Sequence, residues 1–181
     1  MAVRTVAVFC GSKNGKDPLY ATHTASLGVM LAEHGIGIVY GGGNVGIMGI
    51  IADSVMQAGG KVTGVIPEVL VAWERQHTSI TELFVVNNMH DRKKMMYELS
   101  DAAIILPGGF GTLDELFEMI TWNQLSIHDK HIYILNTNGF YDQLIAHIGK
   151  MQQEGFLYEA ATERLSVKPD PAGIIELLLG K

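Results

Sequence analysis

The apolar positions of this chain alternate between short continuous runs and longer stretches with helical spacing. A short apolar run bounded by glycine or polar residues is typical of a strand that is buried on both faces, as in a parallel sheet. Six such runs predict strands over residues 6–10, 36–40, 62–66, 83–86, 102–106 and 132–135. Helices are predicted between them, over residues 19–34, 46–58, 89–100, 113–125 and 141–154, with a last helix after Pro171.

This alternation of strands and helices predicts the fold class. Consecutive strand–helix–strand units form a doubly wound parallel sheet, so we expect an α/β protein whose sheet is flanked by helices on both faces. A length of 181 residues fits a single domain over residues 1–181, and no linker, repeat or low-complexity segment divides it. The least regular region is 67–80, where His77, Thr78 and Ser79 predict a loop over one edge of the site.

Composition and charge narrow the class of partner. The chain is 48% hydrophobic and 18% charged, which is enough apolar material for a full core and excludes a disordered protein. A net charge of -6 argues against general nucleic-acid binding, which needs a basic face. It leaves a mononucleotide open as ligand, because one phosphate needs only a local cluster of donors.

The single cysteine and the apolar runs bear on location. Cys10 cannot form an internal disulfide, which favours a reducing compartment. The first residues lead into a strand without a signal-peptide pattern, and no apolar run reaches the about 18 residues needed to span a bilayer. We therefore expect a cytoplasmic protein without a membrane partner.

Four segments with candidate chemistry directly follow predicted strands. They are residues 10–12 after the first strand, 41–49 after the second, 87–94 after the fourth and 107–115 after the fifth. In open α/β sheets, ligands bind at the carboxyl ends of the strands. We expect the site to be assembled from these four segments.

The segment after the second strand is rich in glycine: Gly41-Gly42-Gly43-Asn44-Val45-Gly46-Ile47-Met48-Gly49. Glycines allow a close backbone approach and a positive φ, and the next helix offers N–H groups to an anion. One interpretation is a tight turn without a ligand. Another is the G-x-G-x-x-G fingerprint of an NAD-type oxidoreductase, with Glu68 near the expected ribose-binding position. That fingerprint normally follows the first strand, so the match here has little specificity.

The segment after the fifth strand turns on three glycines and enters a helix: Pro107-Gly108-Gly109-Phe110-Gly111-Thr112-Leu113-Asp114-Glu115. The N–H groups at the helix start and the Thr112 hydroxyl can bind a phosphate. A structural interpretation is also open, because Thr112 and Glu115 have the spacing of a capping box. However, Asp114, Glu115 and Glu118 would repel a phosphate on the same turn unless cations intervene. A carboxylate at such a site can stabilise positive charge on a sugar or activate a water.

The segment Met89-His90-Asp91-Arg92-Lys93-Lys94 supplies these cations. Asn88 is predicted to cap its helix, with Asp91 in the first turn. Three successive cations near a helix start oppose the helix dipole. A solvated face accounts for Lys94, whereas for Arg92 and Lys93 we favour an anion site, because a guanidinium can bind a phosphate or carboxylate through two hydrogen bonds.

Other kinds of chemistry find no support in the sequence. His90, His128 and His131 lack metal-ligand spacing, so we expect no metal site. Ser12 lacks the G-x-S-x-G context of a serine nucleophile. Cys10 ends a strand, and we interpret it as a packing residue.

The helix predicted over 113–125 carries more apolar residues than one buried face requires. Excess apolar surface on a helix is typical of a subunit contact. We therefore expect a dimer contact formed by the apolar residues of this helix: Leu113, Leu116, Phe117, Met119, Ile120 and Trp122.

Taken together, these segments resemble the LOG ("lonely guy") family, the cytokinin riboside 5′-monophosphate phosphoribohydrolases. The resemblance covers nearly the whole chain. It rests on Cys10-Gly11-Ser12, Gly41-Gly42-Gly43, Gly46-Ile47-Met48-Gly49, Met89-His90-x-Arg92-Lys93 and Pro107-Gly108-Gly109-x-Gly111-Thr112-x-x-Glu115. Such proteins have often been labelled "lysine decarboxylase", but nothing in this sequence points to a pyridoxal-phosphate lysine site.

The resemblance implies a Rossmann-like fold, a homodimer, and hydrolysis of the N-glycosidic bond of a cytokinin riboside 5′-monophosphate or AMP. The products are a free adenine-type base and ribose 5-phosphate, and this chemistry needs no metal or redox cofactor. The resemblance further implies that Arg92 and Glu115 are the catalytic pair. The substrate contacts that it implies are Glu74, Arg92, Lys93, Gly109, Phe110, Gly111, Thr112, Leu113, Asp114, Glu115 and Thr121. We also expect contacts from Ser12 and Gly43, which follow the first and second strands. The alternatives are a non-catalytic nucleotide or cofactor carrier on the same scaffold and, third, the NAD-type oxidoreductase.

Overall fold

The computed structural model describes residues 3–71, 76–158 and 163–180. Within these residues, seven parallel strands form one sheet in the order β4-β3-β2-β1-β5-β6-β7. The strands are β1 (Thr5–Phe9), β2 (Gly37–Tyr40), β3 (Val62–Pro67), β4 (Glu82–Val86), β5 (Ala102–Ile105), β6 (Ile132–Leu135) and β7 (Leu165–Lys168). The α-helices are α1 (Pro18–Glu33), α2 (Gly46–Gln57), α3 (Glu68–Val71), α4 (Met89–Glu98), α5 (Phe110–Gln124), α6 (Asp142–Gln153) and α7 (Pro171–Leu178).

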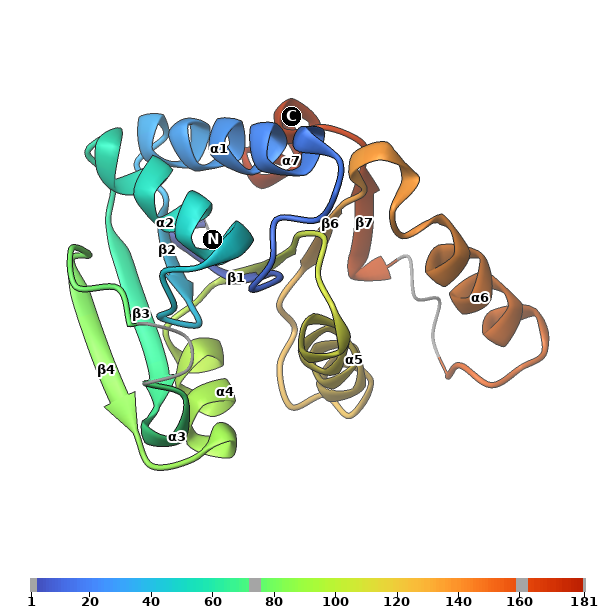
Figure 1. Cartoon of the computed structure of the whole chain (residues 1–181). Helices are drawn as coiled ribbons and strands as arrows, with labels where there is room; N and C mark the ends of the chain where they lie inside the picture. The colour runs from blue at the N-terminus through green and yellow to red at the C-terminus, as the bar shows by residue number, and fades with distance from the viewer. Residues whose placement is uncertain (1–2, 72–75, 159–162, 181) are drawn as a thin grey trace.

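Helices cover both faces of this sheet. Helices α1, α2 and α7 lie on one face, and α4, α5 and α6 lie on the other (Figure 1). Successive strand side chains point to opposite faces, so Val6 and Val8 of β1 belong to the first core, while Ala7 and Phe9 belong to the second. Burial on both faces explains why the strands are continuous apolar runs.

The chain reverses its direction across the sheet between β1 and β5. Strands β1 to β4 extend to one side of this point and β5 to β7 to the other. The loops after β1 and β5 touch there, since the Gly11 N–H donates to the Pro107 carbonyl at 3.1 Å. A reversal of this kind leaves a crevice at the carboxyl ends of the strands, where α/β proteins bind ligands.

The predicted fold class is confirmed, and each predicted strand is present with its ends shifted by at most one residue. Strand β7 and the short helix α3 were not predicted. In β7, Leu165 and Val167 alternate with Ser166 and Lys168, and all four residues are only partly buried, so this edge strand lacks a continuous apolar run. Helix α3 has four residues, which is too short for a helical period to show.

The interpretation of Thr112 and Glu115 as a capping box is wrong. Helix α5 begins at Phe110, three residues earlier than expected, and its N-cap is Gly109, without a side-chain cap from any described residue. Thr112 therefore lies within the first turn and Glu115 within the second. The predicted cap of α4 is confirmed, because the Asn88 side chain accepts the Asp91 N–H at 2.9 Å.

In the described ranges, none of the helices is both long enough and apolar enough to span a membrane. The longest, α1, has 16 residues and includes polar side chains such as His23. The apolar surface of the helices is used against the sheet instead.

Candidate active site

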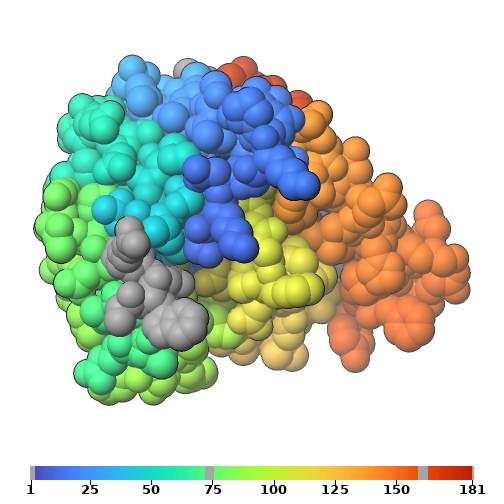
Figure 2. All heavy atoms as spheres, in the orientation of Figure 1, coloured from blue at the N-terminus to red at the C-terminus, as the bar shows by residue number. Residues whose placement is uncertain are grey.

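A cavity of about 360 Å³ opens at the carboxyl ends of the strands, beside the reversal point between β1 and β5. All four predicted segments contribute to its wall. On the surface, atoms of the N-terminal segment (blue) and of the start of α5 (yellow) adjoin on this face of the molecule (Figure 2). The described lining residues are Val8, Phe9, Cys10, Gly11, Ser12, Gly41, Met48, Leu70, Met89, Arg92, Gly109, Phe110, Gly111, Thr112, Asp114 and Glu115.

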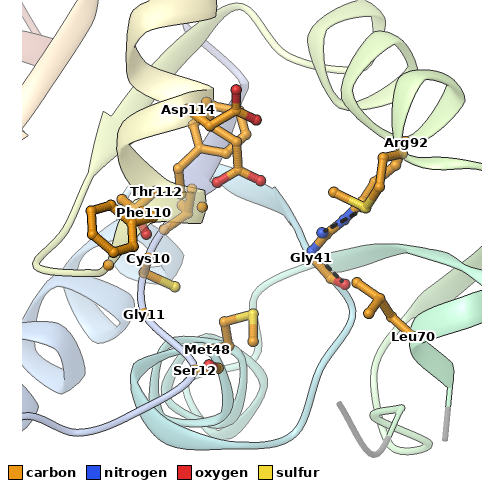
Figure 3. Close-up of a pocket in the computed structure, with 16 residues that line it drawn as sticks. Cys10, Gly11, Ser12, Gly41, Met48, Leu70, Arg92, Phe110, Thr112 and Asp114 are labelled. Atoms are coloured by element: carbon orange, nitrogen blue, oxygen red, sulfur yellow. Dashed lines mark hydrogen bonds between the residues drawn. The ribbon is translucent and has the colours of Figure 1, made fainter. Parts of the chain in front are cut away.

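Arg92 forms one side of the cavity from the first turns of α4. Its side chain is almost buried, with 5% of the residue exposed. Its Nε donates to the Val65 carbonyl and its Nη2 to the Gly41 carbonyl, both at 3.1 Å. A buried charge is tolerated only when it is hydrogen-bonded, and these two carbonyls supply that compensation while fixing the guanidinium plane. Arg92 and Gly41 lie together on one side of the cavity, opposite Phe110, Thr112 and Asp114 (Figure 3).

The glycine turn after β2 is shaped by this arginine. A Cβ on Gly41 would lie 2.0 Å from Nη2 of Arg92, so any other residue there would displace the guanidinium. Gly46 has a φ of +60°, and a Cβ on it would lie 2.3 Å from the Ser12 carbonyl carbon. Contacts within the protein thus account for these glycines, as the interpretation of a tight turn without its own ligand requires.

The start of α5 forms the other side of the cavity. The first N–H groups of a helix have no acceptor within the helix, and together with the helix dipole they favour an anion. Thr112 is buried at this end and lines the cavity. A Cβ on Gly109 or Gly111 would meet no described atom within 4 Å. These two glycines therefore leave open space beside the first turn of α5, and an anion that enters it meets the N–H groups of that turn.

The three carboxylates of α5 are divided between two environments. Lys93 of α4 reaches across to α5, where its Nζ lies 3.2 Å from Asp114 Oδ2 and also contacts Glu118 Oε2. Glu115 is 8% exposed and lines the cavity. Lys93 therefore offsets two of the negative charges, and Glu115 is the almost buried carboxylate in the cavity wall.

The pKa of Lys93 reflects this position between two acids. Burial lowers its pKa, but the hydrogen bonds to Glu118 and Asp114 and the charges of both carboxylates outweigh that effect. The net result is a pKa above the ordinary 10.5, so Lys93 is a cation at neutral pH.

The structure brings most of the expected site residues together, but not all of them. Gly43, Lys93, Leu113 and Thr121 do not line the cavity within the described part of the chain. Lys93 binds carboxylates of the protein itself, as described above, and Leu113 packs against the core under α5. Thr121 is exposed on α5, and Gly43 pairs with Gln76 in an antiparallel bridge. Glu74 lies outside the described residues. The expected residues that do line the cavity are Ser12, Arg92, Gly109, Phe110, Gly111, Thr112, Asp114 and Glu115.

Apolar lining residues were missed in the sequence. Met48 and Met89 stand inside segments that were singled out, so their positions were available as a signal. Leu70 lies on α3, where no motif marks it. Cys10, interpreted as a packing residue, also lines the cavity. These side chains give the cavity a partly apolar wall, which suits a planar base better than it suits a small polar metabolite.

No metal centre emerges from the described side chains. Across residues 3–71, 76–158 and 163–180, no group of three or more His, Cys, Asp or Glu residues is arranged to hold a metal ion. Three histidines singled out in the sequence lie elsewhere: His90 is exposed on α4, and His128 and His131 lie in the segment just before β6.

Comparison with known proteins places this chain among close relatives. A family model described as "Possible lysine decarboxylase" matches residues 48–178. The rice protein named "Probable cytokinin riboside 5′-monophosphate phosphoribohydrolase LOGL2" is 44% identical over 97% of this chain and 72% of its own. The Arabidopsis thaliana protein named "Cytokinin riboside 5′-monophosphate phosphoribohydrolase LOG3" is 42% identical over 97% of this chain and 81% of its own.

Solved structures share the fold at lower identity. The molybdenum cofactor binding protein from the phototrophic bacterium Rippkaea orientalis superposes with a TM-score of 0.74 at 21% identity, covering 98% of this chain and 96% of that one. The molybdenum cofactor carrier protein from Chlamydomonas reinhardtii gives a TM-score of 0.72 at 19% identity, covering 98% and 99%. At these identities the likeness shows the fold alone.

Proposed function

Because this chain belongs to the LOG family of cytokinin riboside 5′-monophosphate phosphoribohydrolases, we propose that it is an enzyme that hydrolyses the N-glycosidic bond of such nucleotides or of AMP. The products are the free adenine-type base and ribose 5-phosphate. The observation that carries the proposal is a single cavity that combines an anchored Arg92, the almost buried Glu115 and an open helix start. The described lining residues include no lysine, so the cavity offers no amine for the Schiff base of a pyridoxal-phosphate decarboxylase.

We place the 5′-phosphate of the substrate at the start of α5. The N–H groups of the first turn and the Thr112 hydroxyl are its donors, and the open space at Gly109 and Gly111 admits it. Asp114 and Glu118 would repel a phosphate in isolation, but Lys93 offsets their charge. Binding energy at the phosphate then holds the sugar in place, although the phosphate does not react.

The bond to be cut joins the sugar carbon C1′ to a ring nitrogen of the base. As it breaks, its electron pair leaves with the base and positive charge develops on the sugar. A water oxygen bonds to C1′ and gives up a proton, and the base takes up a proton. Glu115 is suited to stabilise the cationic sugar or to orient the water, and such a role contributes about 10²–10⁴-fold in rate. Arg92 fixes the substrate and offsets developing negative charge.

A cytoplasmic homodimer built from one nucleotide-binding domain over residues 1–181 is part of the proposal. Support for one domain comes from the single sheet, which contains every described strand. Five of the six apolar residues predicted to form the contact are used inside the protein: Leu116 and Met119 are fully buried, and Leu113, Ile120 and Trp122 pack against the core. Support for the dimer comes instead from the exposed Phe117 and other exposed apolar side chains along α5 and just after it. They are Phe110, Phe117, Leu125 and Ile127. Sedimentation of the wild type and of a Phe117→Glu variant tests this part, because an α5 interface predicts a monomeric variant.

The carrier alternative draws on fold likeness to the molybdenum cofactor proteins, at 19–21% identity. The hydrolase draws on relatives at 42–44% identity. Mass spectrometry of the supernatant from denatured protein separates the two, since a carrier retains its ligand through purification and forms no product. An NAD-type oxidoreductase would bind a nicotinamide cofactor, and its binding would change NAD(P)H fluorescence on titration.

The test of the proposed function is product analysis. Purified protein is incubated with AMP and with isopentenyladenosine 5′-monophosphate, and free base and ribose 5-phosphate are quantified. We expect equimolar products from both nucleotides, and far slower release from adenosine, which lacks the phosphate. Release no greater than that of a Glu115→Gln variant would contradict the proposal.

A further inference from the structure

His77 is a buried polar residue that the proposed chemistry does not use. It lies between α3 and β4 and is only 3% exposed. Its Nε2 lies 3.0 Å from Asp53 Oδ1 on α2, and its Nδ1 accepts the Ser79 N–H at 3.2 Å. Because Nδ1 accepts the Ser79 N–H, Nε2 is the ring nitrogen that donates to Asp53. Both ring nitrogens are therefore engaged, and the ring has one orientation.

The backbone of the same residue is tied to the glycine turn after β2. The His77 N–H donates to the Gly42 carbonyl at 2.9 Å, and the preceding residue, Gln76, pairs with Gly43. Gly42 has a φ of +79°. Glycine adopts positive and negative φ values about equally, so the residue type alone does not fix this conformation. Contacts from outside the turn must hold it in that conformation, and His77 provides one of them.

The same glycine turn also holds Arg92. The Gly41 carbonyl accepts Nη2 of Arg92 at 3.1 Å, and the space around Gly41 is so tight that a Cβ would lie 2.0 Å from that nitrogen. A shift of the turn by about 1 Å would break this hydrogen bond or force the guanidinium aside. A continuous path of contacts therefore runs from Asp53 through His77 and the turn to Arg92.

We propose that His77, held by Asp53, is a positioning residue that fixes the Gly41–Gly43 turn and through it the orientation of Arg92 in the cavity. His77 is not among the described lining residues, so it acts through the turn and not on the substrate. The inference rests on the proposed hydrolysis for its kinetic consequence. A purely structural role for His77 predicts lower stability with unchanged kinetic constants for the folded protein.

Two conservative variants separate the two ring contacts. In His77→Gln the amide nitrogen can take the place of Nε2 and keep the bond to Asp53, whereas in His77→Asn the amide oxygen can keep only the bond to Ser79. Misplacement of a catalytic group by about 1 Å costs up to about 10²-fold. We expect kcat for AMP to fall about 10- to 100-fold in His77→Ala and in His77→Asn, with KM within about threefold of wild type, and to recover most of its value in His77→Gln.

Asp53→Ala tests the same path from the other end. The Asp53 side chain is half exposed, so its removal leaves no buried void, and this variant keeps the test valid if His77→Ala does not fold. His131 is the matched control, since its Nε2 lies 2.9 Å from Ser166 Oγ on β7, away from the cavity lining. We expect His131→Ala to lower stability in urea without changing kcat.

A second readout does not depend on turnover. The His77 amide, which bonds to Gly42, should exchange its hydrogen faster in Asp53→Ala than in wild type, while amides of β6 and β7 stay unchanged. The inference is overturned if His77→Ala and Asp53→Ala keep the wild-type kcat, or if His131→Ala lowers kcat equally. If the wild type releases no base, the proposed function fails, and unchanged exchange at His77 in Asp53→Ala then overturns the inference separately.

Discussion

Two glycine-rich turns border the cavity, and they contain glycine for different reasons. In the turn after β2, a Cβ on Gly41 would lie 2.0 Å from Arg92 and one on Gly46 would lie 2.3 Å from the loop after β1. In the turn after β5, a Cβ on Gly109 or Gly111 would meet nothing within 4 Å among the described residues. Gly108 of the second turn is also tightly packed, since its Cβ would lie 2.1 Å from Thr112 Oγ1. Space inside the protein therefore requires glycine at Gly41, Gly46 and Gly108, whereas at Gly109 and Gly111 the space is open.

This difference indicates a separate role for each turn. The first turn packs around Arg92 and sets its orientation, so its match to a dinucleotide fingerprint is explained without a dinucleotide. In the second turn, Gly109 and Gly111 leave open space beside the start of α5, so a ligand can approach the N–H groups there. Substitution of Gly41 should therefore displace Arg92, whereas substitution of Gly111 should weaken ligand binding.

The largest effect is expected for the arginine that the first turn holds. In Arg92→Lys, a single ammonium replaces the planar fork and cannot keep both carbonyl bonds while facing the substrate. We expect kcat/KM for AMP to fall about 10²–10³-fold, as for loss of one preorganised donor. Arg164→Lys is the control, because Arg164 also donates to a carbonyl, that of Asp129, outside the cavity lining. Equal losses in both variants would contradict the role of the first turn.

The next effect is expected in the first turn itself. In Gly41→Ala, the added methyl occupies the place of Nη2 of Arg92, so the guanidinium must move. We expect kcat to fall about 10²-fold with a smaller change in KM. Gly149→Ala on α6 is the matched control, since its Cβ meets open space and its activity should not change. Steady-state kinetics of both variants measure the difference.

A smaller effect, of another kind, is expected in the second turn. Gly111 lies in the first turn of α5, where alanine favours the helix by about 0.5–1 kcal/mol. We expect Gly111→Ala to be as stable as wild type or more stable in urea, yet to raise KM for AMP about tenfold, because the methyl occupies the ligand's space. An unchanged KM would mean that no ligand approaches at Gly111.

The smallest effect concerns the ion pairs that join α4 to α5. The pKa of Lys93 is raised in the folded protein, so its stabilising contribution is fully present below the ordinary pKa of 10.5 and is lost as pH rises through the folded value. We expect Lys93→Met to lower the free energy of unfolding by about 1 kcal/mol at pH 7. The difference from wild type should shrink above pH 10.5. A difference that does not change with pH would exclude the ion pairs as its cause.

Local patterns predicted the strands and the four segments of the site. Buried parallel strands appear as continuous apolar runs, and the carboxyl ends of such strands converge, so the meeting of residues 10–12, 41–49, 87–94 and 107–115 followed from topology. The interpretation of Thr112 and Glu115 as a capping box was wrong because the N-cap of α5 is Gly109. A glycine has no capping side chain, so the sequence does not mark this helix start.

Adjacent residues and distant partners were harder to predict. Arg92 and Lys93 look like one cationic pair in the sequence, but neighbours on a helix point about 100° apart. Arg92 therefore enters the cavity while Lys93 turns to α5. His77 and Asp53 are 24 residues apart and meet only through the packing of α2 against the loop before β4, which no local pattern records.

The proposed hydrolysis depends most directly on Glu115, the carboxylate assigned to the bond that is cut. Its replacement by glutamine keeps the shape of the side chain and removes the charge, so the measurement is the kcat of Glu115→Gln together with its Kd for AMP. We expect kcat to fall about 10²–10⁴-fold while Kd stays within about threefold of the wild-type value, because the phosphate site at the start of α5 is intact. A variant that binds AMP and still turns it over within about tenfold of the wild-type rate would contradict a catalytic Glu115.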